Sequence, residues 1–316
     1  MSNVQSLFGK YITKGKRIGI IGLDTSHSIE FTKAFNNPAA GPEFAGYKVV
    51  FAYPKGSSDI ESSAKRIPGY TEDIQKYGVK IAESINHLLE NVDAVLLETN
   101  DGRLHLKQAL QVFEAGKPVF IDKPVAASLQ DVIAIYEAAK QFNVPMFSSS
   151  SVRFAPAAEE IVKGKYGKVL GVDVYSPAIL EKTHPDLFWY GIHGVEMLYT
   201  IMGTGCKNVI RVSTSDTDVV TGTWSDERIG NFRGLRAGKM DYGVTVYGEN
   251  EIVTLNNFLG YNPLLVQIIK FFETGVSPVD FKDTLEIYAF MEAADESKRK
   301  GGITISLESV LQKIKQ

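Results

Sequence analysis

Short aliphatic runs alternate with helical patterns through the first half of the chain. The helical patterns fall at residues 28–35, 104–115 and 128–141, the last opened by a capping box of Ser128 and Asp131. The strand-like runs lie at 17–22 (RIGIIG), 48–52, 92–97, 119–121 and 145–147. Strands without polar alternation are buried on both faces, and strands joined by helices form parallel sheets. Residues 1–150 are therefore predicted to form a doubly wound parallel α/β domain.

The pattern changes after residue 151. Helical segments are predicted at 155–162, 186–202, 262–274 and 281–300. Strand-like segments are predicted at 168–175, 210–214, 219–224, 229–232, 242–247 and 251–255, with hairpin turns between some of them. Residues 151–316 are therefore expected to form an α+β domain, with a mostly antiparallel open sheet and helices on one face. A chain of 316 residues is long enough for both cores.

Composition excludes several classes of protein. The formal net charge is −3 and the basic residues are scattered, which argues against a nucleic-acid surface. The single cysteine, Cys206, allows no internal disulfide. The first sixteen residues lack the apolar core of a signal peptide, and no apolar run approaches the length of a membrane span. We therefore expect a cytoplasmic protein.

The turn after the first strand is a degenerate dinucleotide fingerprint. Of the three glycines in G-x-G-x-x-G only Gly22 is present, and Asp24 stands at the second position, where phosphates would lie. In one interpretation Asp24 turns inward and caps the helix, while Thr25, Ser26 and the first amides face the phosphates. In the other, the turn is an ordinary capped helix that binds nothing.

The turn after the second strand bears on the choice of cofactor. It reads YPKGSS from Tyr53 to Ser58, with no acidic residue before Asp59 to hold an adenosine ribose. Lys55 and the two serines could bind a 2′-phosphate, which slightly favours NADP over NAD. A solvated turn without ligand is an equally good interpretation.

Asp122-Lys123-Pro124 follows the strand at 119–121. A lysine at the end of a buried strand can be desolvated, and the proline after it restricts the backbone. Lys123 is thus a candidate for proton transfer. The alternative is a surface lysine after an ordinary strand.

Six features together resemble one family. They are Gly22 after the first strand, Glu98-Thr99-Asn100 followed by His105, Ala115-Gly116-Lys117, Asp122-Lys123-Pro124, Arg153-Phe154 and Gly191-Ile192-His193. In these the chain is similar to the Gfo/Idh/MocA family, which includes glucose–fructose oxidoreductase and inositol dehydrogenase. The resemblance implies a Rossmann domain, NAD or NADP as cofactor, and oxidation or reduction of a carbinol on a sugar, inositol or related polyol. It also implies a homodimer or homotetramer formed through the C-terminal sheet.

The resemblance assigns roles to residues. Lys123 would hold the reacting oxygen and assist proton transfer, and His193 would be its partner from the second domain, in a cleft between the two. Trp189 stands where the family has an aspartate, so Tyr190 or His184 is expected to replace that group, with Trp189 as a stacking wall for a sugar ring. The predicted catalytic residues are Lys123, His193 and Tyr190, and the predicted substrate residues are Arg153, His184, Trp189, Tyr190 and His193. The predicted cofactor-binding residues are Gly22, Thr25, Ser26, His27, Tyr53, Lys55, Thr99, Asn100, Asp122 and Lys123.

Competing interpretations accompany these assignments. Arg153 could instead form a structural salt bridge, and His193 could be a helix histidine bonded to a backbone group. No zinc-binding spacing appears, so no metal is predicted, even where Glu181, His184, Asp186, His193 and Glu196 cluster in sequence. The whole chain could also be a non-redox ligand-binding or regulatory protein that retains the family fold.

Overall fold

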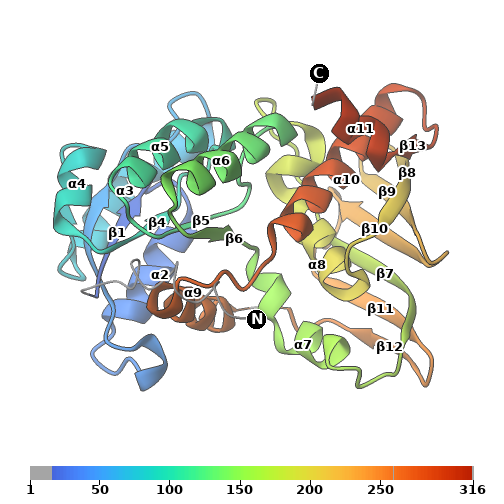
Figure 1. Cartoon of the computed structure of the whole chain (residues 1–316), viewed down its shortest axis with the longest axis horizontal. Coiled ribbons are helices and arrows are strands. Elements are labelled where there is room, and N and C mark those ends of the chain that lie inside the picture. The colour runs from blue at the N-terminus through green and yellow to red at the C-terminus, as the bar shows by residue number, and fades with distance from the viewer. Residues whose placement is uncertain (1–15, 259, 315–316) are drawn as a thin grey trace. The chain divides into compact units, whose positions relative to one another are not determined.

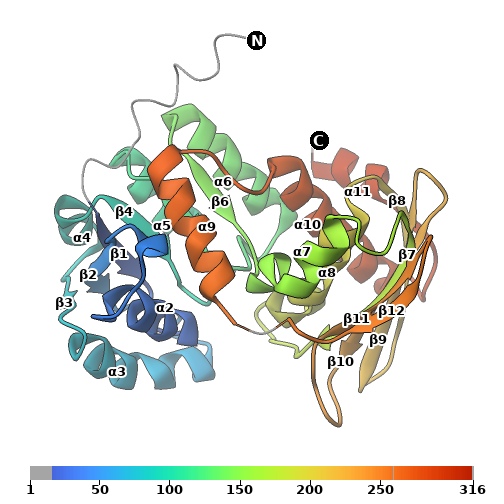
Figure 2. The ribbon, with the colours of Figure 1, turned by 90° about the horizontal axis from the view of Figure 1, so that it is seen from below.

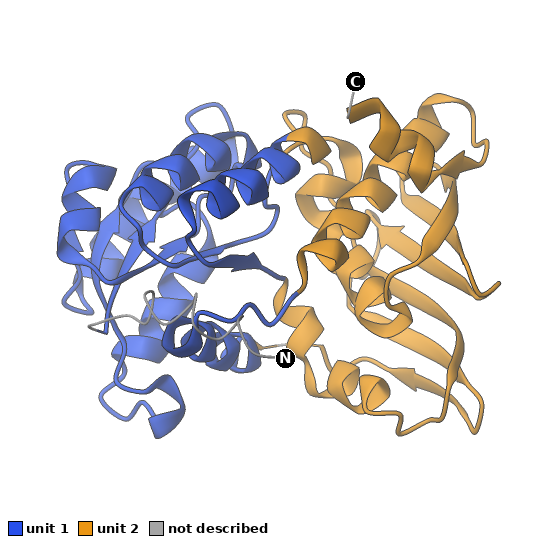
Figure 3. Cartoon of the chain, in the orientation of Figure 1, with its two compact units in different colours: residues 1–126, 131–149, 261–279 blue, residues 127–130, 150–260, 280–316 orange. Residues whose placement is uncertain are grey.

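The computed structural model describes residues 16–258 and 260–314; residues 1–15, part of the segment tested for a signal peptide, lie outside this range. The chain forms two compact units, shown in Figure 3. Unit 1 comprises Met1–Ala126, Asp131–Ser149 and Tyr261–Val279, and unit 2 comprises Ala127–Gln130, Ser150–Gly260 and Asp280–Gln316. Residues 261–279 are therefore part of unit 1, and residues 127–130 are part of unit 2. Among the described helices, none has the length and apolar character needed to cross a membrane.

Unit 1 contains a parallel sheet with the order β3-β2-β1-β4-β5-β6. The strands are β1 (Arg17–Ile21), β2 (Lys48–Tyr53), β3 (Lys80–Ile81), β4 (Ala94–Leu97), β5 (Val119–Ile121) and β6 (Met146–Ser148). Helices α2 (Ser26–Asn36), α3 (Glu61–Gln75), α4 (Ile85–Asn91), α5 (Gly102–Glu114) and α6 (Leu129–Phe142) connect them, and helices lie on both faces of the sheet (Figure 1). This is the predicted doubly wound fold, and its strand order places the switch of direction between β1 and β4.

Four elements of unit 1 were not predicted, namely the short helix η1 (Pro42–Phe44), α3, β3 and α4. Helix α3 is polar, contains Pro68, and buries only Ser63 and Ile74, so it gives almost no periodic apolar signal. Strand β3 is two residues long. Such elements are stabilised by the neighbours they pack against rather than by their own sequence pattern.

Helix α9 (Asn262–Thr274) completes the core of unit 1 from a distant part of the chain. Its Phe271 ring packs edge-on against Phe147 of β6, with centroids 4.9 Å apart, and Phe272 lies 5.9 Å from Tyr47. Its apolar stripe predicted a buried helix but not which sheet it covers. That choice depends on tertiary contacts, which the local sequence pattern does not reveal.

Unit 2 contains a mixed, mostly antiparallel sheet with the order β12-β11-β7-β10-β9-β8-β13. Its strands are β7 (Val169–Pro177), β8 (Cys206–Ser213), β9 (Thr217–Trp224), β10 (Ile229–Leu235), β11 (Gly243–Gly248), β12 (Ile252–Leu255) and β13 (Ile305–Ser306). Only β7 and β10 pair in parallel. Helices α8 (Ile192–Met202) and α10 (Phe281–Arg299) cover one face of this sheet (Figures 1 and 2). Helix α7 (Pro156–Val162) packs against α8, and α11 (Leu307–Ile314) packs against α10. The predicted antiparallel sheet with helices on one face is confirmed.

A buried arginine joins the sheet of unit 2 to its helices. Arg211 of β8 is 1% exposed, and its guanidinium donates to Asp218 on β9 and to Asp186, both at 2.9 Å, and to Asp295 on α10. The backbone N–H of Arg211 also donates to Ser297 at 3.0 Å. One cation therefore balances carboxylates from three parts of the unit.

Replacing Arg211 should destabilise the protein strongly. In Arg211→Leu, Asp218 keeps its ion pair with Arg236 and Asp186 keeps that with Lys298, but buried Asp295 loses its partner. Breaking a buried ion pair by removing one partner costs about 3–5 kcal/mol of unfolding free energy. Urea denaturation followed by circular dichroism measures the loss. Arg233→Leu, at an exposed position of β10, is the matched control and should change stability little. Equal stability of the two variants would show that the cluster around Arg211 does not stabilise the fold.

Candidate active site

Three buried carboxylates gather where parallel strands of unit 1 end. Asp24 follows β1, Glu98 follows β4 and Asp122 follows β5, and their exposures are 0%, 0% and 2%. The carboxyl ends of parallel strands are the usual ligand-binding edge of a doubly wound sheet. Burial of three acidic groups is costly unless each charge is compensated, so the surroundings of each group define what this edge can do.

Asp24 is compensated by the backbone. Its carboxylate accepts hydrogen bonds from the N–H groups of Asn100, at 3.0 Å, and Ser57, at 3.2 Å. It thereby connects the turns that follow β1, β2 and β4. Burial raises the pKa of Asp24, and the two N–H donors partly offset that effect. A Cβ atom at Gly56 would lie 2.1 Å from an Asp24 oxygen, so this turn must have glycine beside the carboxylate.

The start of α2 differs from the sequence expectation. Asp24 does turn inward, but the N-cap of the helix is Thr25, whose side chain accepts from the His27 N–H at 3.5 Å. Asp24 does not cap the helix, because its oxygens already accept from the neighbouring turns. Ser26 is exposed, so it and the amides of the first turn remain the predicted phosphate contacts.

Gly22, the one fingerprint glycine, is required by geometry. It has a φ of +94°, and a Cβ there would lie 2.5 Å from the Thr99 Cα. The Gly22 N–H donates to the Tyr53 carbonyl at 2.9 Å. The turns after β1, β2 and β4 are thus in direct backbone contact, with Lys55 exposed nearby along the chain.

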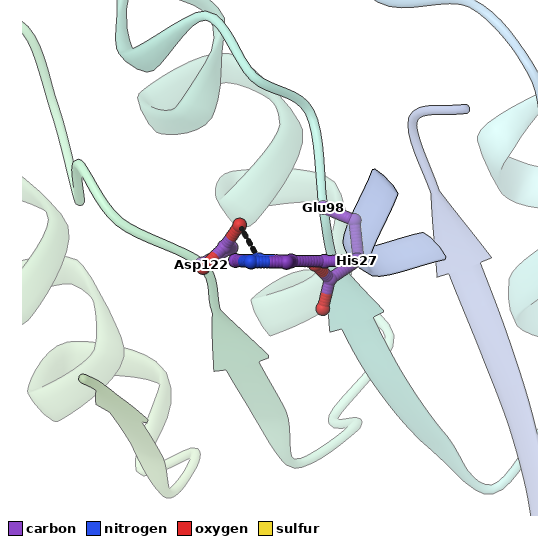
Figure 4. A group of neighbouring side chains, drawn as sticks. All are labelled: His27, Glu98 and Asp122. Atoms are coloured by element: carbon purple, nitrogen blue, oxygen red, sulfur yellow. Dashed lines mark hydrogen bonds and ion pairs between the residues drawn. The ribbon is translucent and has the colours of Figure 1, made fainter. Parts of the chain in front are cut away.

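His27, Glu98 and Asp122 form a compact group, shown in Figure 4. His27 Nδ1 lies 2.7 Å from Asp122 Oδ2 and 4.0 Å from Glu98 Oε2. Burial alone would raise the pKa of Asp122, but His27 and Lys123 lower it to about 2. Burial raises the pKa of Glu98 well above its usual range, and the charge of Asp122 adds to the effect.

Lys123 lies next to this group in the chain. The residue is 6% exposed, and its backbone N–H donates to Asp122 Oδ1 at 2.8 Å. The Lys123–Pro124 peptide bond is cis. The alternative of an ordinary surface lysine is therefore wrong. His105 links the segments that follow β4 and β5. One ring nitrogen lies 2.6 Å from the Thr99 carbonyl oxygen, and the other lies 3.0 Å from that of Val125.

The predicted histidine of unit 2 is also buried. His193 Nδ1 lies 2.6 Å from Ser150 Oγ, so a side chain is one partner of the ring. The His193 ring also lies edge-on to those of Tyr190 and Tyr242, with centroid separations of 5.1 Å and 6.0 Å. These contacts bring together two of the predicted catalytic residues, His193 and Tyr190.

Arg153, a predicted substrate residue, is engaged in ion pairs. Its Nε donates to Glu196 at 2.8 Å, and an Nη atom lies 3.3 Å from Asp283. Glu196 also accepts from the Ser150 N–H at 2.8 Å. These contacts match the structural salt bridge that was the alternative interpretation, and substrate binding by Arg153 stays a prediction.

Trp189 and His184 form a second aromatic pair in unit 2. Their ring centroids are 4.9 Å apart, and His184 Nδ1 lies 2.9 Å from Thr183 Oγ1. Trp189 and Tyr190 lie on a π-helical turn, η3 (Leu187–Gly191), that precedes α8. The sequence predicted a regular helix from residue 186. A π turn adds a residue per turn and so changes where these side chains point relative to His193.

Sequence reasoning missed the importance of two groups at the sheet edge. Glu98 was noted only as part of a motif, and Tyr261, from the segment before α9, was not noted at all. Tyr261 lies edge-on to His27, with centroids 4.9 Å apart. A charged residue directly after a fully apolar strand was the available signal for Glu98. No local signal exists for Tyr261, since it is 234 positions from its partner in the numbering (261 − 27).

Comparison with known proteins places this arrangement in a family. Residues 16–150 match the Gfo/Idh/MocA model, described as an oxidoreductase family with an NAD-binding Rossmann fold. A segment of 129 residues is 29% identical to 1,5-anhydro-D-fructose reductase of Ensifer adhaerens, covering 39% of this chain and 38% of that protein. A segment of 157 residues is 27% identical to an uncharacterized oxidoreductase of Streptococcus pneumoniae, covering 47% of this chain and 42% of that protein. The matched segments thus span less than half of either relative.

Solved structures extend the similarity in fold to both units. The crystal structure of a myo-inositol dehydrogenase from Corynebacterium glutamicum superposes with a TM-score of 0.73 at 15% identity, covering 92% of this chain and 98% of that one. The solved structures show a shared fold, and the family model matches the first part of the chain. Its NAD-binding-type domain, residues 16–150, belongs to the Gfo/Idh/MocA family, which confirms the resemblance found in the sequence.

Removing the Asp24 carboxylate should destabilise the protein. Asp24→Ala leaves the Ser57 and Asn100 N–H groups without their acceptor and should lower the unfolding free energy by about 2–3 kcal/mol. Chemical denaturation tests this. Asp226→Ala is the control, because Asp226 is exposed and pairs with Arg228 in unit 2. A loss no larger than that of the control would contradict the role given to Asp24.

Proposed function

We propose that the protein is an NAD(P)-dependent oxidoreductase that transfers hydride between nicotinamide and a carbinol of a sugar, inositol or related polyol. The observation that carries the proposal is the buried Lys123 at the end of β5, in a domain of an NAD-binding oxidoreductase family. The names of the relatives, an anhydrofructose reductase and a myo-inositol dehydrogenase, support the substrate class.

The chemistry requires a hydride acceptor and a proton acceptor. When bound, the nicotinamide ring accepts the hydride that leaves the carbinol carbon. Lys123 is the proposed proton acceptor: its Nζ binds the reacting hydroxyl oxygen and takes the hydroxyl proton as the carbonyl forms. The Lys123 N–H donates to Asp122 Oδ1 at 2.8 Å, which holds the backbone of Lys123 beside that carboxylate.

His193 is assigned the second proton-handling role. The hydrogen-bonding distance to Ser150 orients the ring, and the Tyr190 ring packs edge-on against it. Trp189, beside His184, offers an aromatic face of the kind that suits the C–H side of a sugar ring. The proposed substrate residues His184, Trp189, Tyr190 and His193 therefore form two adjoining pairs along one short segment.

NADP is slightly favoured over NAD. The first acid after β2, Asp59, pairs with Arg103 at 2.6 Å and accepts from the Ser57 hydroxyl at 2.8 Å. Its oxygens are thus engaged and less suited to a ribose diol. Lys55 is exposed and can meet a 2′-phosphate.

A non-redox ligand-binding protein is the second candidate. The observation that favours it is the Asp24 carboxylate at a position where the fingerprint has glycine. A negative charge beside the expected pyrophosphate opposes its binding. Titration with NADH and NADPH decides between the two candidates, because absence of binding at millimolar concentration would contradict the oxidoreductase proposal.

Lys123→Ala should separate chemistry from binding. We expect turnover of the reactive polyol to fall by about 10²–10⁴-fold, the usual contribution of a positioned acid or base, with dinucleotide affinity nearly unchanged. A panel of polyols and keto-sugars, followed by nicotinamide absorbance, supplies the assay. Lys140→Ala, at an exposed position of α6, is the control. Turnover by Lys123→Ala at the wild-type rate would show that another residue transfers the proton.

We also propose that unit 2 associates with a second copy through the uncovered face of its sheet. Ile210, Val212, Ile229 and Tyr247 are exposed there and alternate with residues buried under the helices. Exposed apolar side chains grouped on one surface are typical of an interface.

Val212→Lys should weaken this association. Val212 is 64% exposed on the sheet, and Val162, 61% exposed at the end of α7, provides a matched Val→Lys control. Light scattering coupled to size-exclusion chromatography should show a lower mass for Val212→Lys and the wild-type mass for Val162→Lys. A wild-type protein that is monomeric at high concentration would contradict the proposal.

A further inference from the structure

The group of His27, Glu98 and Asp122 has the composition of a metal site. One ligand atom from each, a ring nitrogen and two carboxylate oxygens, lie within 4.8 Å of one another. The three residues come from three separate positions, at the start of α2 and after β4 and β5, and all are buried (Figure 4). Their convergence is therefore a product of the fold and not of local sequence.

Glu98 provides a second, independent observation. Its side chain is fully buried, and within the described part of the chain neither of its carboxylate oxygens has a hydrogen-bond partner. A buried polar atom without a partner is rare in folded proteins because it loses its hydration without replacement. The Glu98 carboxyl is directed toward His27 (Figure 4), with Oε2 4.0 Å from Nδ1. The charges of His27 and Lys123 lower the pKa of Asp122, whereas the Glu98 oxygens have no hydrogen-bond donor among the described residues.

We propose that His27, Glu98 and Asp122 bind a divalent transition-metal ion. Imidazole nitrogen combined with carboxylate oxygens suits Zn²⁺ or Mn²⁺ better than Mg²⁺ or Ca²⁺, which prefer oxygen ligands alone. Zn²⁺ binds such atoms at about 2.0–2.2 Å, which places ligand atoms about 3.4 Å apart in a tetrahedral site. The observed separations from His27 Nδ1, 2.7 Å to Asp122 and 4.0 Å to Glu98, lie on either side of that value. Small side-chain rotations would complete the site.

The surroundings of two ligands already fix their orientation. The His27 ring is stacked on Phe31, with centroids 5.2 Å apart, and held edge-on by Tyr261. Asp122 accepts the Lys123 N–H through Oδ1, which leaves Oδ2 directed at His27. Contacts of this kind orient metal ligands and contribute to affinity. Three protein ligands also leave at least one position on the ion for water or a substrate oxygen.

The inference does not depend on the proposed redox function. The competing explanation is that a proton, and not a metal ion, neutralises Glu98. A metal ion and a proton make opposite predictions for titration of the protein with metal alone, so the two can be distinguished without any dinucleotide.

The test is isothermal titration of metal-stripped, tag-free protein with ZnCl₂ and, separately, MnCl₂. We expect one ion per chain for at least one metal, with a thermal shift on binding. Glu98→Gln and His27→Gln should each weaken binding by more than about 100-fold, since even the outer partners of metal ligands contribute about 10–100-fold. Glu114→Gln, at an exposed position near the end of α5, is the matched control and should bind as wild type does.

Two outcomes would overturn the inference. The first is the absence of saturable binding of either metal by folded wild-type protein. The second is binding that persists unchanged in both Glu98→Gln and His27→Gln, which would place the ion elsewhere. Circular dichroism of each variant shows whether it is folded. Titration of the same samples with NADH and NADPH tests the proposed function separately, because either activity can fail without the other.

Discussion

The structure depends on how negative charge is accommodated at the carboxyl edge of one parallel sheet. Three carboxylates are buried there, and each has a different environment. Asp24 accepts two backbone N–H groups. Asp122 lies within hydrogen-bonding distance of His27 and accepts the N–H of Lys123. Glu98 has no hydrogen-bond partner among the described residues. The first two arrangements hold the turns of the sheet together, and the third is where a ligand can add a stabilising contact.

The same charges constrain what can bind. A dinucleotide carries its own negative phosphates to this edge, and the Ser57 and Asn100 amides are already used by Asp24. The remaining attraction must come from the amides at the start of α2 and from nearby cations. Lys55, exposed after β2, is one such cation, and a metal ion held by His27, Glu98 and Asp122 would be another. The proposed cofactor site and the proposed metal site therefore lie at the same negatively charged edge of the sheet.

Much of the fold could be predicted from the sequence, because its main strands are continuous apolar runs and its main helices have periodic apolar faces. Lys123 and His193 were identifiable because they stand in motifs at strand ends and within a helix. Helix α3 escaped prediction because it buries almost nothing, and the position of α9 depends on Phe147 and Tyr47, which are distant in the chain. The inward orientation of the Asp24 side chain depends on backbone amides of two other turns. The position of Glu98 beside His27 and Asp122, without a hydrogen-bond partner among the described residues, depends on where the other strands end. Neither follows from local patterns, since tertiary contacts determine both.

Hydrogen–deuterium exchange, measured with and without NADPH or NADH, tests most directly whether this edge is the functional surface. The account predicts slower exchange on ligand binding in the segments that follow β1, β4 and β5, at residues 22–28, 98–102 and 122–126, with strands β8 and β9 unchanged. Saturation of the protein with dinucleotide without slower exchange in those three segments would contradict it.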